Sequence, residues 1–120
     1  MIFLGIGSNL NSKYGNRFSN IKKTIQLILS EEIKIKKISS FYETPSYPNQ
    51  KNPKFINVII EVESQLSPEN LLKKILFVEK KMKRRRSVKD EPRICDIDII
   101  DFNKIIINKK KYQLTSPKGS

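Results

Sequence analysis

The sequence contains no histidine and no tryptophan, and its 120 residues include a single cysteine, Cys95. Structural and catalytic zinc sites rely mainly on cysteine and histidine ligands, so this composition argues against a zinc centre. One cysteine also excludes a disulfide bond within the chain. The sequence further lacks a Gly-x-x-x-x-Gly-Lys loop, so a backbone cradle of the Walker type is not available for phosphate groups.

Long apolar segments are absent as well. The N-terminal run from Met1 to Gly7 is too short for the apolar part of a secretory signal, and no basic residues precede it. No apolar run approaches the roughly 20 residues that a membrane-spanning helix needs. We therefore expect a cytoplasmic protein that does not bind a membrane.

Acidic residues are scarce relative to basic ones, with 12 against 24 and a formal net charge of +12. This excess favours an anionic partner such as nucleic acid, an acidic membrane or nucleotide phosphate, although lysines spread along a chain are equally typical of a solvated surface. The arginines are clustered instead, because four of the five lie within ten residues of sequence. These four are Arg84, Arg85, Arg86 and Arg93.

The pattern of apolar residues predicts one α+β domain that spans residues 1–120. Strands are predicted over Ile2–Ile6, Ile33–Tyr42, Phe55–Val62, Ile94–Phe102 and Ile105–Ile107. Helices are predicted over Arg17–Ser30 and from an N-cap at Ser67 onward, with loops over Thr44–Pro53 and Lys80–Pro92. The order predicts a ferredoxin-like antiparallel sheet with helices packed on it. The tail from Lys109 shows no obvious closing element.

The segment from Pro92 to Ile100 carries the most informative pattern. Side chains alternate across a strand, so Asp96 and Asp98 share one face, roughly 7 Å apart between Cα atoms. Two such carboxylates are stable together when they are solvated or when a hard cation lies between them, and Mg²⁺ binds through one or two carboxylates plus substrate phosphates. The alternative is an edge strand with a solvated polar face. Asp101 has the opposite parity and is set aside.

The arginine cluster precedes this pair in the sequence. Arg93 lies three residues before Asp96, and Arg84, Arg86 and Glu79 come from the preceding helix and loop. Phosphoryl transfer depends mostly on positioning and charge stabilisation, and the planar guanidinium group suits phosphate oxygens. The combination favours binding of a magnesium-nucleotide, whereas the arginine run alone is also typical of a solvated loop.

A second candidate pair is Phe55 and Asn57, which point the same way on a regular strand. An aromatic ring for stacking beside an amide for hydrogen bonds would suit a flat heterocycle. Taken alone, the pair is more typical of a core aromatic residue and an amide that closes a turn.

Several motifs occur together in one order. They are Ile6 to Leu10, Ser40 to Pro45, Phe55 to Asn57, Leu66 to Leu72, Val78-Glu79 and Pro92 to Ile99. On these motifs the chain resembles the 6-hydroxymethyl-7,8-dihydropterin pyrophosphokinases of folate synthesis, from its first residue to about Pro117. The Pro-Arg-x-x-Asp-x-Asp-Ile match is highly specific, and the other matches are moderately so.

The resemblance implies an enzyme that transfers pyrophosphate from ATP to the hydroxymethyl group of the pterin and releases AMP. It implies that Asp96 and Asp98 hold two Mg²⁺ ions. It further implies catalytic roles for Arg84 and Arg93, and nucleotide contacts from Glu79, Arg84, Arg86, Arg93 and the backbone of Ile99. The pterin contacts that it implies are Asn9, Thr44, Pro45, Tyr47, Phe55 and Asn57. We expect a monomer with pterin and ATP as its partners.

This sequence departs from the family pattern at several positions. Lys83 replaces the glycine before the loop arginine, and Lys89 to Glu91 replace a stretch that often contains tryptophan or glycine. Lys118 stands where a nucleotide-contacting histidine is usual, and the C-terminal elements of the family are expected to be missing. An inactive relative therefore stays open as an alternative. So does a basic RNA-binding module of the same fold class, although no aromatic pair marks a stacking platform.

Overall fold

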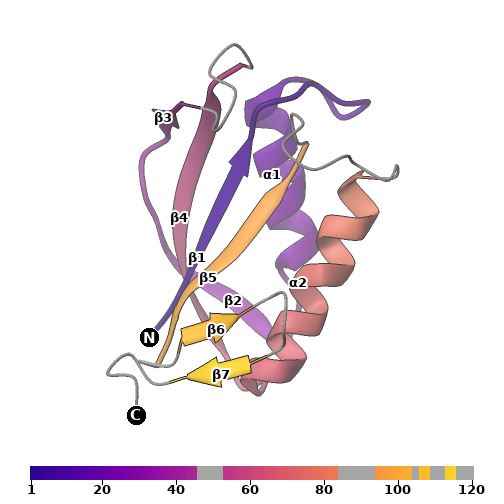
Figure 1. Cartoon of the computed structure of the whole chain (residues 1–120). Helices are drawn as coiled ribbons and strands as arrows, with labels where there is room; N and C mark the ends of the chain where they lie inside the picture. The colour runs from indigo at the N-terminus through magenta and orange to yellow at the C-terminus, as the bar shows by residue number, and fades with distance from the viewer. Residues whose placement is uncertain (46–52, 84–93, 104–105, 109–112, 116–120) are drawn as a thin grey trace.

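The computed structural model describes residues 1–45, 53–83, 94–103, 106–108 and 113–115. Their elements are β1 (Ile2–Ser8), α1 (Arg17–Ile28), β2 (Ile33–Ile38), β3 (Tyr42–Thr44), β4 (Phe55–Ser64), α2 (Pro68–Lys83), β5 (Asp96–Phe102), β6 (Ile106–Asn108) and β7 (Gln113–Thr115). Strands β2, β4, β1 and β5 lie side by side in that order, and β3 pairs with β4 (Figure 1). All these pairings are antiparallel. The predicted α+β class with a ferredoxin-like sheet is confirmed.

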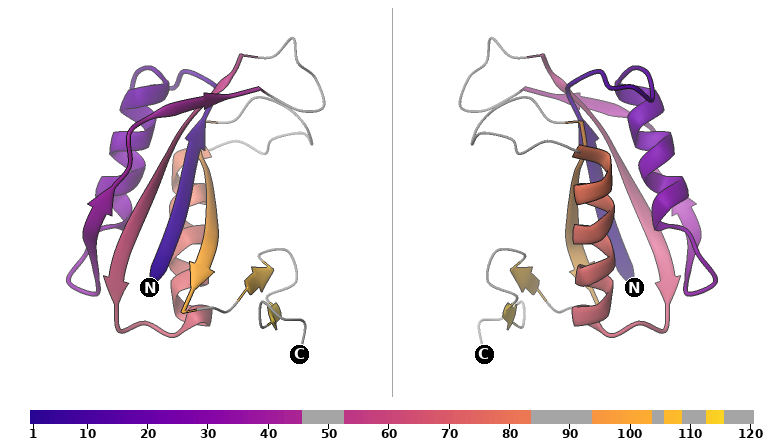
Figure 2. Two further views of the ribbon diagram at one scale, coloured as in Figure 1. Left: turned by 90° about the vertical axis from the view of Figure 1, so that its left-hand side faces the viewer. Right: turned by 90° about the vertical axis from the view of Figure 1, so that its right-hand side faces the viewer.

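Both helices pack on the same face of the sheet, and among the described residues no helix covers the opposite face (Figure 2). The core lies between sheet and helices, because alternate residues of the strands are buried there. On β1 these are Ile2, Leu4 and Ile6, and on β5 Ile97 is fully buried. The residues between them in sequence therefore point to the helix-free face. None of the helices in the described residues is long and apolar enough to cross a membrane.

Strand β1 is two residues longer than predicted. Gly7 and Ser8 continue the strand instead of forming a turn, because both neighbours extend the ladder to this end of the sheet. Gly7 pairs with Asn57 on β4 and with Asp96 on β5, and Ser8 pairs with Ile56.

The predicted strand over Ile33–Tyr42 is wrong in its continuity, since β2 ends at Ile38 and β3 begins at Tyr42. Both pieces pair with β4. The interruption lies at Ser39, whose hydroxyl accepts the N–H of Ile59 at 2.8 Å in place of a backbone carbonyl. This break turns the chain so that β3 reaches the end of the sheet where Gly7 lies.

The helices begin as predicted but end differently. Ser67 caps α2, because its hydroxyl accepts the N–H of Asn70 at 3.2 Å. The helix continues to Lys83, so the predicted start of a loop at Lys80 is wrong, and Met82 is buried at helical spacing. Helix α1 is capped by Asn16 and ends at Ile28, two residues before the predicted end at Ser30.

The C-terminal strands also differ from the prediction. Strand β5 begins at Asp96 instead of Ile94, and β6 covers Ile106–Asn108 instead of Ile105–Ile107. The tail contains a further strand, β7, which pairs with β6. No strand was predicted in this part of the chain.

A bulge in β5 changes the parity of Asp101. Leu4 pairs with Ile99 and Phe3 pairs with Asp101, so Ile100 is skipped in the ladder. Asp101 therefore lies on the same face of the sheet as Asp96 and Asp98. Simple alternation along the strand had predicted the opposite face.

A buried polar network ties α1 to the loop after β1. The side-chain amide of Asn20 donates to the hydroxyl of Ser8 at 3.2 Å and to the carbonyl of Leu10 at 2.7 Å. The hydroxyl of Ser12 donates to the same side chain. Asn20 is fully buried, so these bonds replace water that it has lost.

We expect Asn20→Ala to lower the free energy of unfolding by about 2 kcal/mol, because it leaves buried polar partners without their bonds. Urea denaturation followed by circular dichroism measures this change. The exposed Lys22 on the same helix provides the control, and Lys22→Ala should change stability by less than about 0.5 kcal/mol. Equal effects of the two substitutions would contradict the role given to the network.

Candidate active site

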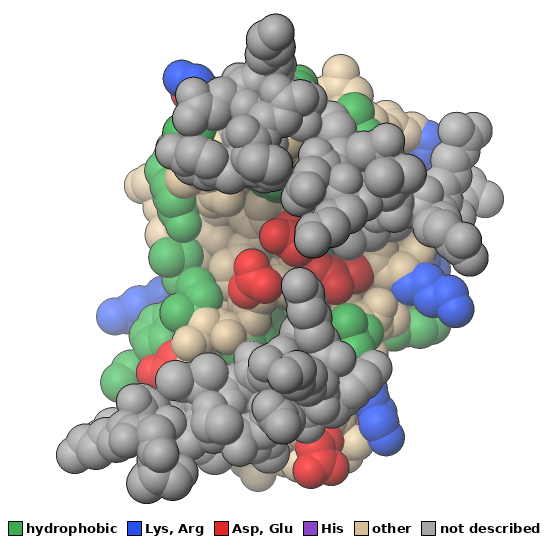
Figure 3. Space-filling model, viewed as in Figure 1, with side chains coloured by type: hydrophobic (Ala, Val, Ile, Leu, Met, Phe, Trp, Pro, Cys, Tyr) green, Lys and Arg blue, Asp and Glu red, His purple; other side chains and the backbone are tan. Residues whose placement is uncertain are grey.

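A pocket of about 280 Å³ opens on the helix-free face, where β1, β3, β4 and β5 come together. Its lining residues are Gly5, Ile6, Gly7, Tyr42, Thr44, Phe55, Asn57, Asp96, Asp98 and Ile100. Acidic side chains gather at the centre of this face, over β5 (Figure 3). The lining is mixed, with aromatic and aliphatic groups, one amide and two carboxylates, as is usual for a small-molecule site.

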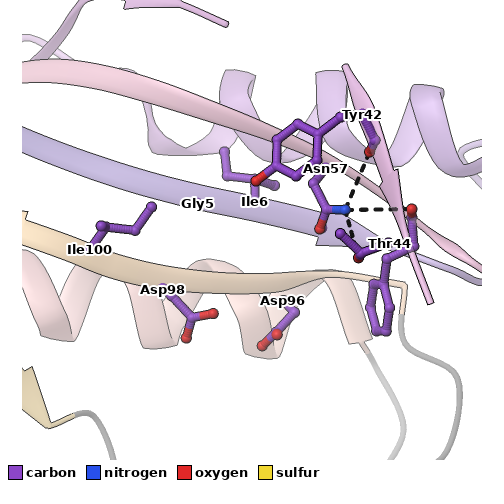
Figure 4. A pocket seen from close by; sticks show the side chains of 10 residues that line it. Gly5, Ile6, Tyr42, Thr44, Asn57, Asp96, Asp98 and Ile100 are labelled. Carbon is purple, nitrogen blue, oxygen red and sulfur yellow. Dashed lines mark hydrogen bonds between the residues drawn. The ribbon is translucent and has the colours of Figure 1, made fainter. Parts of the chain in front are cut away.

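Asp96 and Asp98 project from β5 toward the same side of the sheet (Figure 4). Ile97 between them is fully buried on the other face, so the strand is held by the core while its two carboxylates meet the pocket. Asp96 pairs with Gly7 and Asp98 with Gly5 on the neighbouring strand β1. This confirms the prediction that Asp96 and Asp98 share one face of their strand.

Asn57 organises the other end of the pocket. Its side-chain amide nitrogen donates to the hydroxyl of Thr44 at 2.9 Å and to the carbonyl of Tyr42 at 3.3 Å (Figure 4). It also lies 3.4 Å from the carbonyl of Phe55. These bonds fix the amide on β4 against β3, so its oxygen has a defined direction and can accept a hydrogen bond.

Gly7 makes room for this arrangement. A Cβ atom at this position would lie 2.8 Å from the Oδ1 atom of Asn57 and 3.3 Å from a ring carbon of Phe55. The glycine is therefore required by close approach. At Gly5 a Cβ atom would meet only the end of the Ile100 side chain, at 3.1 Å.

Three other predicted site residues lie around the pocket without lining it. Asn9 is buried, and its amide donates to the carbonyl of Pro53 at 3.1 Å, which supports the start of β4. Pro45 is exposed just beyond β3. The side chain of Ile99 is partly buried and packs against the core.

Glu79 is buried on α2, where its carboxylate accepts the backbone N–H of Ile97 at 2.8 Å. This contact reaches the strand that carries the aspartates. Arg84, Arg86, Arg93 and Tyr47 lie outside the described residues.

Tyr42 and Gly7 are lining residues that the sequence pattern did not single out as ligand contacts. Tyr42 lies within the Phe-Tyr-Glu-Thr-Pro motif, which is the signal that could have included it. For Gly7 the requirement appears only with the close approach of β4, which is a property of the folded sheet.

Comparison with known proteins agrees with this architecture. Residues 3–119 match the model of the family described as 7,8-dihydro-6-hydroxymethylpterin-pyrophosphokinase. The chain belongs to this pyrophosphokinase family. The resemblance drawn from the motifs is therefore confirmed.

Curated relatives of this pyrophosphokinase family cover nearly the whole chain. A 2-amino-4-hydroxy-6-hydroxymethyldihydropteridine pyrophosphokinase of Aquifex aeolicus is 35% identical over 97% of this chain and 69% of its own length. A relative of the same name in Helicobacter pylori is 34% identical over 99% of this chain and 72% of its own length. The folic acid synthesis protein fol1 of Pneumocystis carinii is 31% identical over 98% of this chain, which corresponds to 15% of that larger protein.

Proposed function

We propose that the protein transfers the β,γ-pyrophosphate of ATP to the hydroxymethyl group of 6-hydroxymethyl-7,8-dihydropterin in folate synthesis. The substrate oxygen attacks the β-phosphorus of ATP, the bond from that phosphorus to the α,β-bridging oxygen breaks, and AMP leaves. The hydroxyl proton passes to solvent. The observation that carries the proposal is the pocket, which places the Asp96/Asp98 pair beside an amide and an aromatic ring in a chain of this family.

The end of the pocket around Asn57 suits the pterin. Its fixed amide oxygen can accept an N–H from the edge of a flat heterocycle, and Phe55 offers a ring for stacking. Thr44 adds a hydroxyl at the same edge. We assign Asn9 and Pro45 to the support of this end, and Tyr47 to its rim.

The other end suits a divalent cation with polyphosphate. Asp96 and Asp98 both line this end of the pocket and supply hard oxygen ligands. Mg²⁺ binds through one or two carboxylates together with phosphate oxygens, so the pair suits a magnesium-nucleotide. Two bound Mg²⁺ ions would neutralise phosphate charge and polarise the reacting phosphoryl group.

The chain's own residues then have separate tasks. Asp96 and Asp98 would hold the ions on a strand that packs on the core, and Asn57 would orient the heterocycle so that its hydroxymethyl group faces these two residues. We assign Arg84 and Arg93 to the charge that develops on the phosphates, with Arg86 as a further phosphate contact. The backbone near Ile99 is assigned to adenine.

Product analysis tests the proposal directly. Incubation with ATP, Mg²⁺ and the pterin should yield AMP and the pterin diphosphate in equal amounts, which chromatography with ultraviolet detection measures. Formation of ADP, or no product at all, would contradict it. Affinity for RNA that falls steeply with salt, with no turnover, would instead favour a nucleic-acid-binding module.

We expect Gly7→Ala to raise the KM for the pterin at least about tenfold while kcat changes little. The added methyl group would displace Asn57 and Phe55 from their positions. Steady-state kinetics at saturating ATP measure this change. Gly5→Ala should have a clearly smaller effect, because the flexible end of Ile100 can move aside. A larger effect at Gly5 would contradict the steric role given to Gly7.

A further inference from the structure

Glu79 is an acidic residue whose side chain is buried between α2 and the sheet. Its side chain is only 6% exposed, whereas the other acidic residue of α2, Glu69, is exposed. A carboxylate is costly to bury unless hydrogen bonds or charges compensate for its lost water. Within the described residues, every buried side-chain nitrogen or oxygen atom has a hydrogen-bond partner, so Glu79 is compensated.

One hydrogen-bond partner of Glu79 is the backbone of Ile97, which lies between Asp96 and Asp98 on β5. Strand β5 forms an edge of the five-stranded sheet, and alternate N–H groups of an edge strand point away from its single neighbour. The N–H of Ile97 donates to Oε2 of Glu79 at 2.8 Å. Hydrogen bonds to a charged acceptor are stronger than neutral ones, so this contact fixes the backbone between Asp96 and Asp98.

We propose that Glu79 is a positioning residue that sets the spacing and direction of the Asp96 and Asp98 carboxylates for divalent cations. This inference rests on the proposed function. It gives Glu79 a task in addition to the nucleotide contact implied by the resemblance, because its carboxylate binds the backbone of the strand that carries the aspartates. Groups that orient metal ligands in this way typically affect metal affinity by about 10- to 100-fold when they are replaced.

Two substitutions of similar length separate the hydrogen bond from packing. Glu79→Met fills the same space but removes the acceptor, and Glu79→Gln keeps an oxygen that can accept the N–H of Ile97. Hydrogen exchange of the Ile97 amide, followed by nuclear magnetic resonance, should be slow in the wild type, slow in Glu79→Gln and at least about tenfold faster in Glu79→Met. Equal exchange in all three proteins would overturn the proposed contact, whatever the activity of the chain.

Metal binding tests the functional consequence. Binding of Mn²⁺ in the presence of a non-hydrolysable ATP analogue, measured by electron paramagnetic resonance, should be weaker by about tenfold in Glu79→Met. Glu79→Gln should stay within about threefold of the wild type, and the KM for the pterin should change less than the half-saturating Mg²⁺ concentration in both.

A destabilised core variant gives the control for a merely structural role. Ile28→Ala on α1 removes a buried side chain and should lower the melting temperature without changing Mn²⁺ affinity. If Glu79→Met lowers the melting temperature but leaves Mn²⁺ affinity normal, the inference is overturned and the proposed function is not affected. A wild-type chain that binds no Mn²⁺ with the nucleotide would overturn the proposed function together with it.

Discussion

Asp96→Asn is expected to lower the rate of AMP formation by about a thousandfold. The substitution keeps the shape of the side chain but removes one of the two negative charges on β5 that face the pocket. Stabilisation of phosphate charge by a bound cation contributes several kcal/mol, and about 1.4 kcal/mol corresponds to a tenfold change in rate. The rate is measured by a coupled assay for AMP at saturating ATP and pterin.

Asp101→Asn provides a matched control on the same strand. Asp101 pairs with Phe3 and does not line the pocket, so its replacement should change the rate by less than about threefold. Comparable rates for wild type and Asp96→Asn would contradict the assignment of metal ligands. Equal losses in both variants would indicate that general negative charge on this face is needed, and not a specific pair.

Asn57→Ala is expected to lower kcat/KM for the pterin by about a hundredfold. The substitution removes the acceptor oxygen proposed for the heterocycle and also the bonds that tie β4 to Thr44 and Tyr42. A site that hydrogen-bonds its substrate loses much of its preference for that substrate when one partner of the hydrogen bond is absent. Steady-state kinetics with varied pterin measure the loss, and the half-saturating concentration of ATP should stay nearly constant.

Asn70→Ala serves as the control for this second change. Asn70 is exposed near the start of α2 and is absent from the pocket lining. Its replacement should leave kcat/KM within about twofold. Loss of affinity for ATP instead of pterin in Asn57→Ala would contradict the placement of the heterocycle at this end of the pocket.

The sequence predicted the strand that carries the aspartates because alternation is a local property. Two carboxylates separated by one apolar residue share a face on any regular strand, and burial of Ile97 follows from the same pattern. The order of the elements was likewise sufficient for the fold class. The same reasoning placed Phe55 and Asn57 together, which the pocket confirms.

Other features depend on contacts between distant segments and could not be read from local patterns. The bulge at Ile100 restores Asp101 to the side of the other aspartates, and it arises from the pairing with β1. The break after Ile38 depends on the hydroxyl of Ser39 meeting β4. Glu79 has ordinary helical spacing in the sequence, and only the folded chain brings it to the N–H of Ile97.

The most direct test of the account is a crystal structure of the protein with Mg²⁺ and a non-hydrolysable ATP analogue. We expect divalent cations bound at the carboxylates of Asp96 and Asp98, next to the phosphate oxygens of the analogue. A correctly folded protein with no cation at this position, or with the analogue bound on the helix-covered face, would contradict it.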